Sequence, residues 1–100
     1  ALPALERAVA LRPNFAAGWL RVGEAKEALG RRTEAIADYR RALTVEPSTT
    51  DAYVALARAL RAAGDVEGSR AALALGEKYA RRPEVVTQAA AATSGEVPRP

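Results

Sequence analysis

The chain has 100 residues, of which 15 are Lys or Arg and 12 are Asp or Glu, and it contains no cysteine and no histidine. It can therefore form neither disulfides nor thiolate metal sites, and it lacks the commonest general base, so we expect neither an enzyme nor a bound metal or cofactor. The net charge of +3 comes from basic residues interleaved with acidic ones, which argues against nucleic acid as a partner.

The balance of apolar residues indicates an all-α protein. Hydrophobic residues make up 49% of the chain but aromatic residues only 5%, and alanine is abundant, as is typical of closely packed helices. No window holds the roughly 20 apolar residues of a membrane-spanning helix, and no charged-then-apolar leader opens the chain, so we expect a soluble, cytoplasmic protein without membrane insertion. Because Leu2 already lies in an apolar pattern, we expect a segment of a longer protein.

Two helices are predicted at the start of the chain. Apolar residues at helical spacing predict the first over 2–12, which Pro13 ends. The second is predicted over 15–30, because Asn14 can cap its first turn and Gly30 can adopt the left-handed conformation that ends many helices.

The next two helices are predicted from similar signals. A third helix over 33–46 cannot continue through Pro47. Ser48 and Asp51 resemble a capping box, which predicts a fourth helix that ends at Gly64.

The last third of the chain predicts two more helices and a tail. Asp65 can cap a fifth helix, which Pro83 is expected to interrupt. A sixth, alanine-rich helix is predicted over 84–93, and residues 94–100 have too few apolar groups to fold. Because the connections are only two to four residues long, neighbouring helices should form antiparallel hairpins.

The chain also repeats itself with a period of 34 residues, the distance from Pro13 to Pro47. Such self-similarity is the signature of a helical repeat array. The same offset aligns Leu5 with Tyr39, Ala8 with Ala42, Trp19 with Tyr53, Val22 with Leu56 and Gly30 with Gly64.

These residues resemble the signature of the tetratricopeptide repeat, a 34-residue helical hairpin. The first full repeat carries the signature at Trp19, Val22, Gly23, Ala35, Tyr39, Ala42 and Pro47. The second fits it at Tyr53, Leu56, Ala57, Leu60, Ser69, Leu73 and Gly76, with Arg81 in place of the closing proline. Leu5, Ala8 and Pro13 fit the second half of a preceding repeat.

The resemblance implies a right-handed α-solenoid of antiparallel hairpins, with about five helices and a C-terminal capping helix. The tetratricopeptide repeat domain is then expected over 1–93, and its parts are a partial repeat over 1–14, full repeats over 16–49 and 50–83, and the capping helix over 84–93, followed by a disordered tail over 94–100.

Close helix packing accounts for the signature. Gly23 and Ala35 are small because the two helices of a hairpin must approach to about 8–10 Å, while Trp19 and Tyr39 fill the space beside them as core residues. Lys26 departs from the pattern, because the family usually places an aromatic residue there; we expect its aliphatic stem to cover the site.

The family function implied by the resemblance is to bind a protein or peptide partner in a concave groove lined by the first helix of each hairpin. Carried over by repeat position, the peptide-binding residues are Leu20, Arg21, Glu24, Glu27, Asp51, Val54, Arg58 and Arg61. Leu20 and Glu24 stand where a chaperone-tail-binding subgroup has its clamp of Lys and Asn, which argues against that subgroup.

The charges of the groove allow two interpretations. Arg58 and Arg61 are three residues apart and can converge on one acidic group, or they can pair with Glu24, Glu27 or Asp51 on the surface.

An alternative function is a structural or oligomerisation segment of a larger enzyme or secretion assembly. The first helix lacks its hairpin partner, so we expect the apolar side formed by Leu2, Leu5 and Val9 to be exposed and to support a homo-oligomer.

Overall fold

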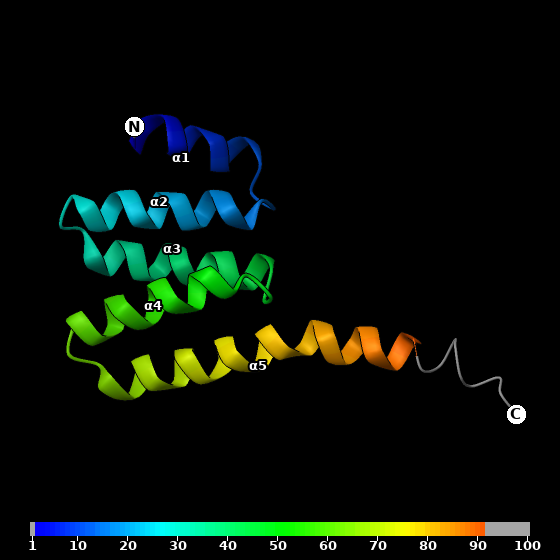
Figure 1. Cartoon of the computed structure of the whole chain (residues 1–100). Helices are drawn as coiled ribbons and strands as arrows, with labels where there is room; N and C mark the ends of the chain where they lie inside the picture. The colour runs from blue at the N-terminus through cyan, green and yellow to red at the C-terminus, as the bar shows by residue number, and fades with distance from the viewer. Residues whose placement is uncertain (1, 92–100) are drawn as a thin grey trace, which may run out of the picture.

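The computed structural model describes residues 2–91, with side chains for residues 2–80. Within that range the chain is all-α and its helices stack in chain order (Figure 1). The helices are α1 (Leu2–Leu11), α2 (Ala16–Ala28), α3 (Arg32–Val45), α4 (Thr50–Ala62) and α5 (Val66–Ala91). The predicted all-α array of antiparallel helices is therefore confirmed.

Tight turns at two glycines build the hairpins. Gly30 follows α2 with a φ of 82° and Gly64 follows α4 with a φ of 94°, a conformation that costs glycine little because it has no Cβ. The turns fold α3 back on α2 and α5 back on α4, and these two pairs share the largest contacts. α4 packs on α3 and also reaches α2, and α1 packs on α2.

The predicted helix caps are correct at one position and wrong at two. Asp65 caps α5, because its Oδ1 accepts a hydrogen bond from the Gly68 amide at 2.8 Å. Phe15, not Asn14, is the N-cap of α2, and it has no side-chain bond. α4 begins one residue too late for a capping box at Ser48, whose hydroxyl instead donates to Glu46 at 2.8 Å.

The helix over the last third of the chain differs from the prediction. α5 does not stop at Pro83 but continues to Ala91, so the residues predicted as a separate helix over 84–93 belong to α5 as far as they are described. An internal proline removes one backbone hydrogen bond and often bends a helix without ending it. The tail predicted over 94–100 lies outside the described residues, and the repeat boundaries remain predictions.

Small and large residues interlock in both hairpins, as predicted for Gly23 and Tyr39 of the first. Tyr39 is fully buried, and a Cβ on Gly23 would lie only 2.5 Å from its Cε1 atom. A Cβ on Gly76 would lie 2.8 Å from the Cβ of Tyr53, whose ring stacks on Tyr79 with the centroids 5.8 Å apart. The glycines are therefore required by close approach of the helices.

Trp19 lies at the edge of the core rather than inside it. It is partly buried against the core, and its indole N–H donates to the carbonyl of Pro13 at 2.8 Å. The guanidinium of Arg41 lies 4.7 Å from the ring centroid, within cation–π range. Trp19 thus joins α2, the preceding loop and α3.

The apolar side of α1 is turned toward α2, contrary to the prediction that it is exposed. Val9 is buried where α1 meets Gly18, and Leu2 and Leu5 are half-buried. The prediction treated α1 as half of a missing hairpin, but its strongest apolar stripe packs on the next helix. The large exposed apolar groups at this end of the array are Leu11, Phe15 and Leu29.

Candidate functional site

The predicted binding residues come from α2 and α4, the first helices of the two hairpins, and an ion pair joins these helices. Arg58 Nη2 of α4 lies 3.8 Å from Glu27 Oε1 of α2. Both helices present charged side chains beside this contact, and we call this surface the α2/α4 face. Its exposed members are Arg21, Asp51, Val54, Arg58 and Arg61, and its half-buried members are Glu24 and Glu27.

Leu20 does not belong to this surface, so its assignment to the groove is wrong. Its side chain is only 6% exposed and it is a member of the buried core cluster. Val54, which follows it by one repeat, is 54% exposed. The two positions differ because α4 packs onto the first hairpin.

The charges of the α2/α4 face are partly paired with one another. Arg21 donates to Glu24 at 3.0 Å within α2, and Arg58 contacts Glu27 across the two helices. The pairing that was expected for Arg58 and Arg61 as an alternative to ligand binding is thus present for Arg58. In the part of the chain that the structure describes, Arg61 and Asp51 form no ion pair within 4 Å, so Arg61 is a cation available to a partner.

Glu27 connects three helices. Besides its contact with Arg58 of α4, its Oε1 accepts a hydrogen bond of 2.6 Å from the hydroxyl of Tyr39 on α3. Burial raises the pKa of Tyr39, and the bond to Glu27 raises this pKa further. Sequence reasoning missed this bridge, because it placed Glu27 on the surface and Tyr39 in the core without connecting them.

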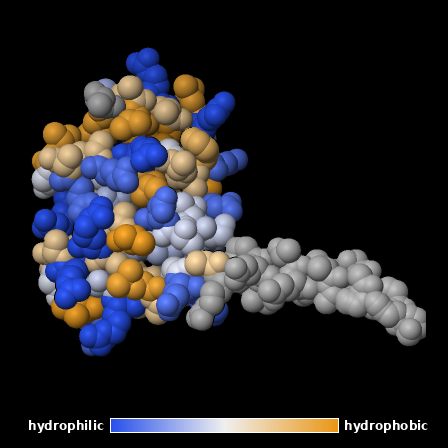
Figure 2. Space-filling view, viewed as in Figure 1, coloured by the Kyte–Doolittle hydropathy of each residue, from blue (hydrophilic) through white to orange (hydrophobic). Residues whose placement is uncertain are grey.

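A hollow of about 250 Å³ brings together three of the predicted residues. Val54, Arg58 and Arg61 of α4 line it, as do Ala57 of the same helix and Ser69 and Leu73 of α5. Leu73 was predicted only as a packing residue, yet it is 48% exposed here. Over the visible face of the stack, hydrophilic and hydrophobic side chains are intermixed (Figure 2).

Comparison with known proteins assigns the family. Two sequence models of the tetratricopeptide repeat match the chain, one over residues 27–92 and the other over residues 1–43. The chain belongs to the tetratricopeptide repeat family. No curated protein sequence is significantly similar to it.

Solved structures agree with this tetratricopeptide repeat fold. Three structures of MamA superpose on 83–84% of the chain with TM-scores of 0.78, 0.76 and 0.75, at 20%, 25% and 24% sequence identity. The chain covers only 46–48% of those proteins, so it spans about half their length. The likeness shows a shared fold.

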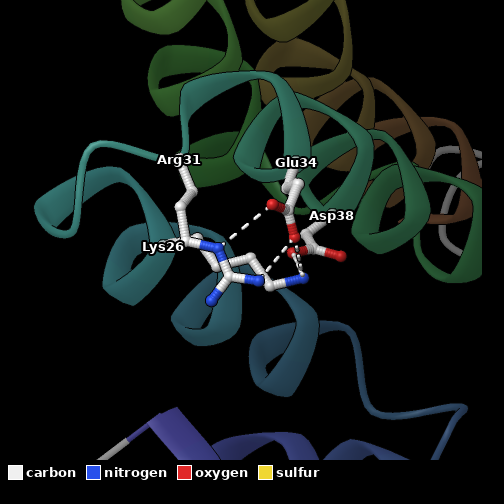
Figure 3. Close-up of polar contacts among 4 residues, drawn as sticks. All are labelled: Lys26, Arg31, Glu34 and Asp38. Atoms are coloured by element: carbon white, nitrogen blue, oxygen red, sulfur yellow. Dashed lines mark hydrogen bonds and ion pairs between the residues drawn. The ribbon is translucent and has the colours of Figure 1, made fainter.

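The departure of Lys26 from the tetratricopeptide repeat pattern is explained by an ion cluster between α2 and α3 (Figure 3). Lys26 Nζ lies 3.1 Å from Asp38 Oδ2 and 3.6 Å from Glu34 Oε1. Arg31 donates two hydrogen bonds to Glu34, of 2.8 and 3.0 Å, and these bonds lower the pKa of Glu34. Sequence reasoning expected the lysine stem to cover the site but not a buried acidic partner.

The bond between Tyr39 and Glu27 gives a pH-dependent prediction. Tyr39→Phe should lower the free energy of unfolding at neutral pH by about 1–2 kcal/mol, because Glu27 loses a donor in a half-buried place. Burial raises the pKa of Tyr39 and Tyr53, so both ionise more readily in the unfolded chain. The parent chain should therefore lose stability as the pH rises above about 10, and Tyr39→Phe should lose less. Denaturant titrations below and above that pH measure these losses. If the parent and Tyr39→Phe lost equal stability, the contribution assigned to Tyr39 would be wrong.

The part of the chain that the structure describes holds neither a membrane-spanning helix nor a metal-binding cluster. None of its helices combines the length and the apolar character needed to cross a membrane. No three acidic side chains in this range gather closely enough to hold a metal ion.

Proposed function

We propose that the chain is a non-catalytic module that binds a peptide or helix of another protein on its α2/α4 face. The observation that carries the proposal is the hollow beside this face, where Arg58 and Arg61 flank the apolar Val54 and Leu73. A cationic rim around an apolar floor suits a partner with both acidic and apolar side chains. Family membership supports the same function, since repeat arrays present extended surfaces to protein partners.

Charge reversal on α4 tests the proposal. Peptides selected from a random library for binding to the chain should include acidic residues, and Arg58→Glu with Arg61→Glu should weaken their binding about tenfold or more. Binding by the parent chain should also weaken as salt is added, because exposed charges are screened. Isothermal titration calorimetry measures both effects, and circular dichroism checks that the helix content is unchanged.

A matched control separates this site from general charge effects. Arg32→Glu with Arg40→Glu changes the net charge equally, at two exposed positions of α3. It should leave the selected peptides bound as before. If both double variants weaken binding equally, or if neither does, the α2/α4 face is not the site.

A further inference from the structure

The first hairpin can be compared with the second position by position, because the two are related by the repeat. A shift of 34 residues carries the first hairpin, α2 and α3, onto the second, α4 and α5. α4 covers the first hairpin, whereas no helix in the described range covers the corresponding side of the second. Tyr39 is 0% exposed but its counterpart Leu73 is 48% exposed, and Leu20 is 6% exposed against 54% for Val54. We call the uncovered surface of Val54, Arg58, Arg61 and Leu73 the end face.

The segment that would cover the end face in the repeat register, beginning near residue 84, forms part of α5 instead. In the 34-residue register the next covering helix would begin near residue 84, as α4 begins at Thr50. Instead, α5 continues through these residues to Ala91 and extends past the N-terminal end of α4 (Figure 1). The end face therefore has the shape of a helix-docking site, but no helix of the described range covers it.

The charge of the end face is opposite to that of the internal interface. In the first hairpin the covering helix supplies Arg58, which contacts Glu27 at 3.8 Å, and Glu24 lies three residues before Glu27 on α2. One repeat later the two glutamates are replaced by Arg58 and Arg61. A helix that docks in the same way must therefore present a carboxylate where α4 presents its arginine, because like charges across an interface are repelled.

The covering helix also defines the apolar part of a partner. α4 buries a stripe of alanines, Ala52, Ala55 and Ala59, at the spacing of one helix face. Small residues allow the axes to approach closely, as they do elsewhere in this array. The floor of the end face, Ala57 and the buried Ser69, is likewise made of small residues.

We propose that the end face binds an acidic amphipathic helix of a partner protein, with small apolar residues on its buried side, in the orientation in which α4 covers the first hairpin. This inference rests on the proposed function and specifies it, because it names the class of partner and centres the contact on Leu73 rather than on α2. The occupant is a separate helix that carries at least one carboxylate opposite Arg61.

A peptide derived from the chain tests the proposal directly. The probe is the α4 sequence, residues 50–62, with Arg58→Glu, and its control is the unmodified α4 peptide. Titrated into the full chain and followed by amide chemical shifts, the acidic peptide should shift residues around Ser69 and Leu73, and it should bind about three- to tenfold more tightly than the control. On the Arg61→Glu variant, the order of the two peptides should reverse.

The variant Leu73→Glu distinguishes this inference from the proposed function. It changes a half-exposed position, so the fold should persist, and it should abolish binding of the acidic peptide. Peptides selected on the α2/α4 face that depend on Arg58 and Arg61 but bind Leu73→Glu normally would overturn the end-face proposal and leave the function intact. Equal binding of the two α4 peptides would also overturn it. So would a change in the amide chemical shift of Leu73 with protein concentration alone, which would assign the end face to a second copy of the chain.

Discussion

Replacing Gly23 with leucine should lower the free energy of unfolding by about 3 kcal/mol. Even a Cβ at this position would lie 2.5 Å from Tyr39 Cε1 and 3.2 Å from the carbonyl oxygen of Ala35. Tyr39 cannot move away easily, because its ring is fully buried and its hydroxyl is held by Glu27 at 2.6 Å. The overlap must therefore separate α2 from α3.

Chemical denaturation of Gly23→Leu measures this loss. Ala37→Leu on α3 is the matched control, because it adds a leucine at an exposed helix position and should change stability by less than about 0.5 kcal/mol. A variant of Gly23 as stable as the parent would contradict the small-beside-large packing of the hairpin.

Replacing Lys26 with methionine should lower the free energy of unfolding by about 2–3 kcal/mol. The side chains of Lys26 and Asp38 are only 13% and 10% exposed, and their ion pair of 3.1 Å lies between α2 and α3. Removal of the lysine leaves a buried carboxylate without its cation, which costs more than the pair itself contributes.

Two further variants distinguish the effect of an unpaired Asp38 carboxylate from the effect of removing any lysine. Lys78→Met removes an exposed lysine of α5 and should be nearly neutral. Lys26→Met combined with Asp38→Leu removes both charges and should recover most of the stability, because the site then holds only apolar groups. If the double variant is as unstable as Lys26→Met alone, the unpaired carboxylate is not the cause.

The sequence by itself determined the features that depend on local signals. Helices α1 to α4 lie within a few residues of their predicted positions, because apolar spacing and the breakers Pro13 and Pro47 act on the residues beside them. Gly30 and Gly64 adopt the predicted left-handed conformation for the same reason. The 34-residue period indicated the repeat, since equivalent positions of a repeat array have the same packing requirements.

Only the tertiary structure decided which of these positions face a partner. Leu20 and Val54 are equivalent in the repeat, yet one is buried and the other exposed, because exposure depends on whether a further helix covers the hairpin. The pair of Lys26 with Asp38 and the bridge from Glu27 to Tyr39 and Arg58 likewise join residues on different helices. A linear pattern specifies the side of a helix on which a residue lies, whereas burial and charge pairing depend on what the neighbouring helices bring against it.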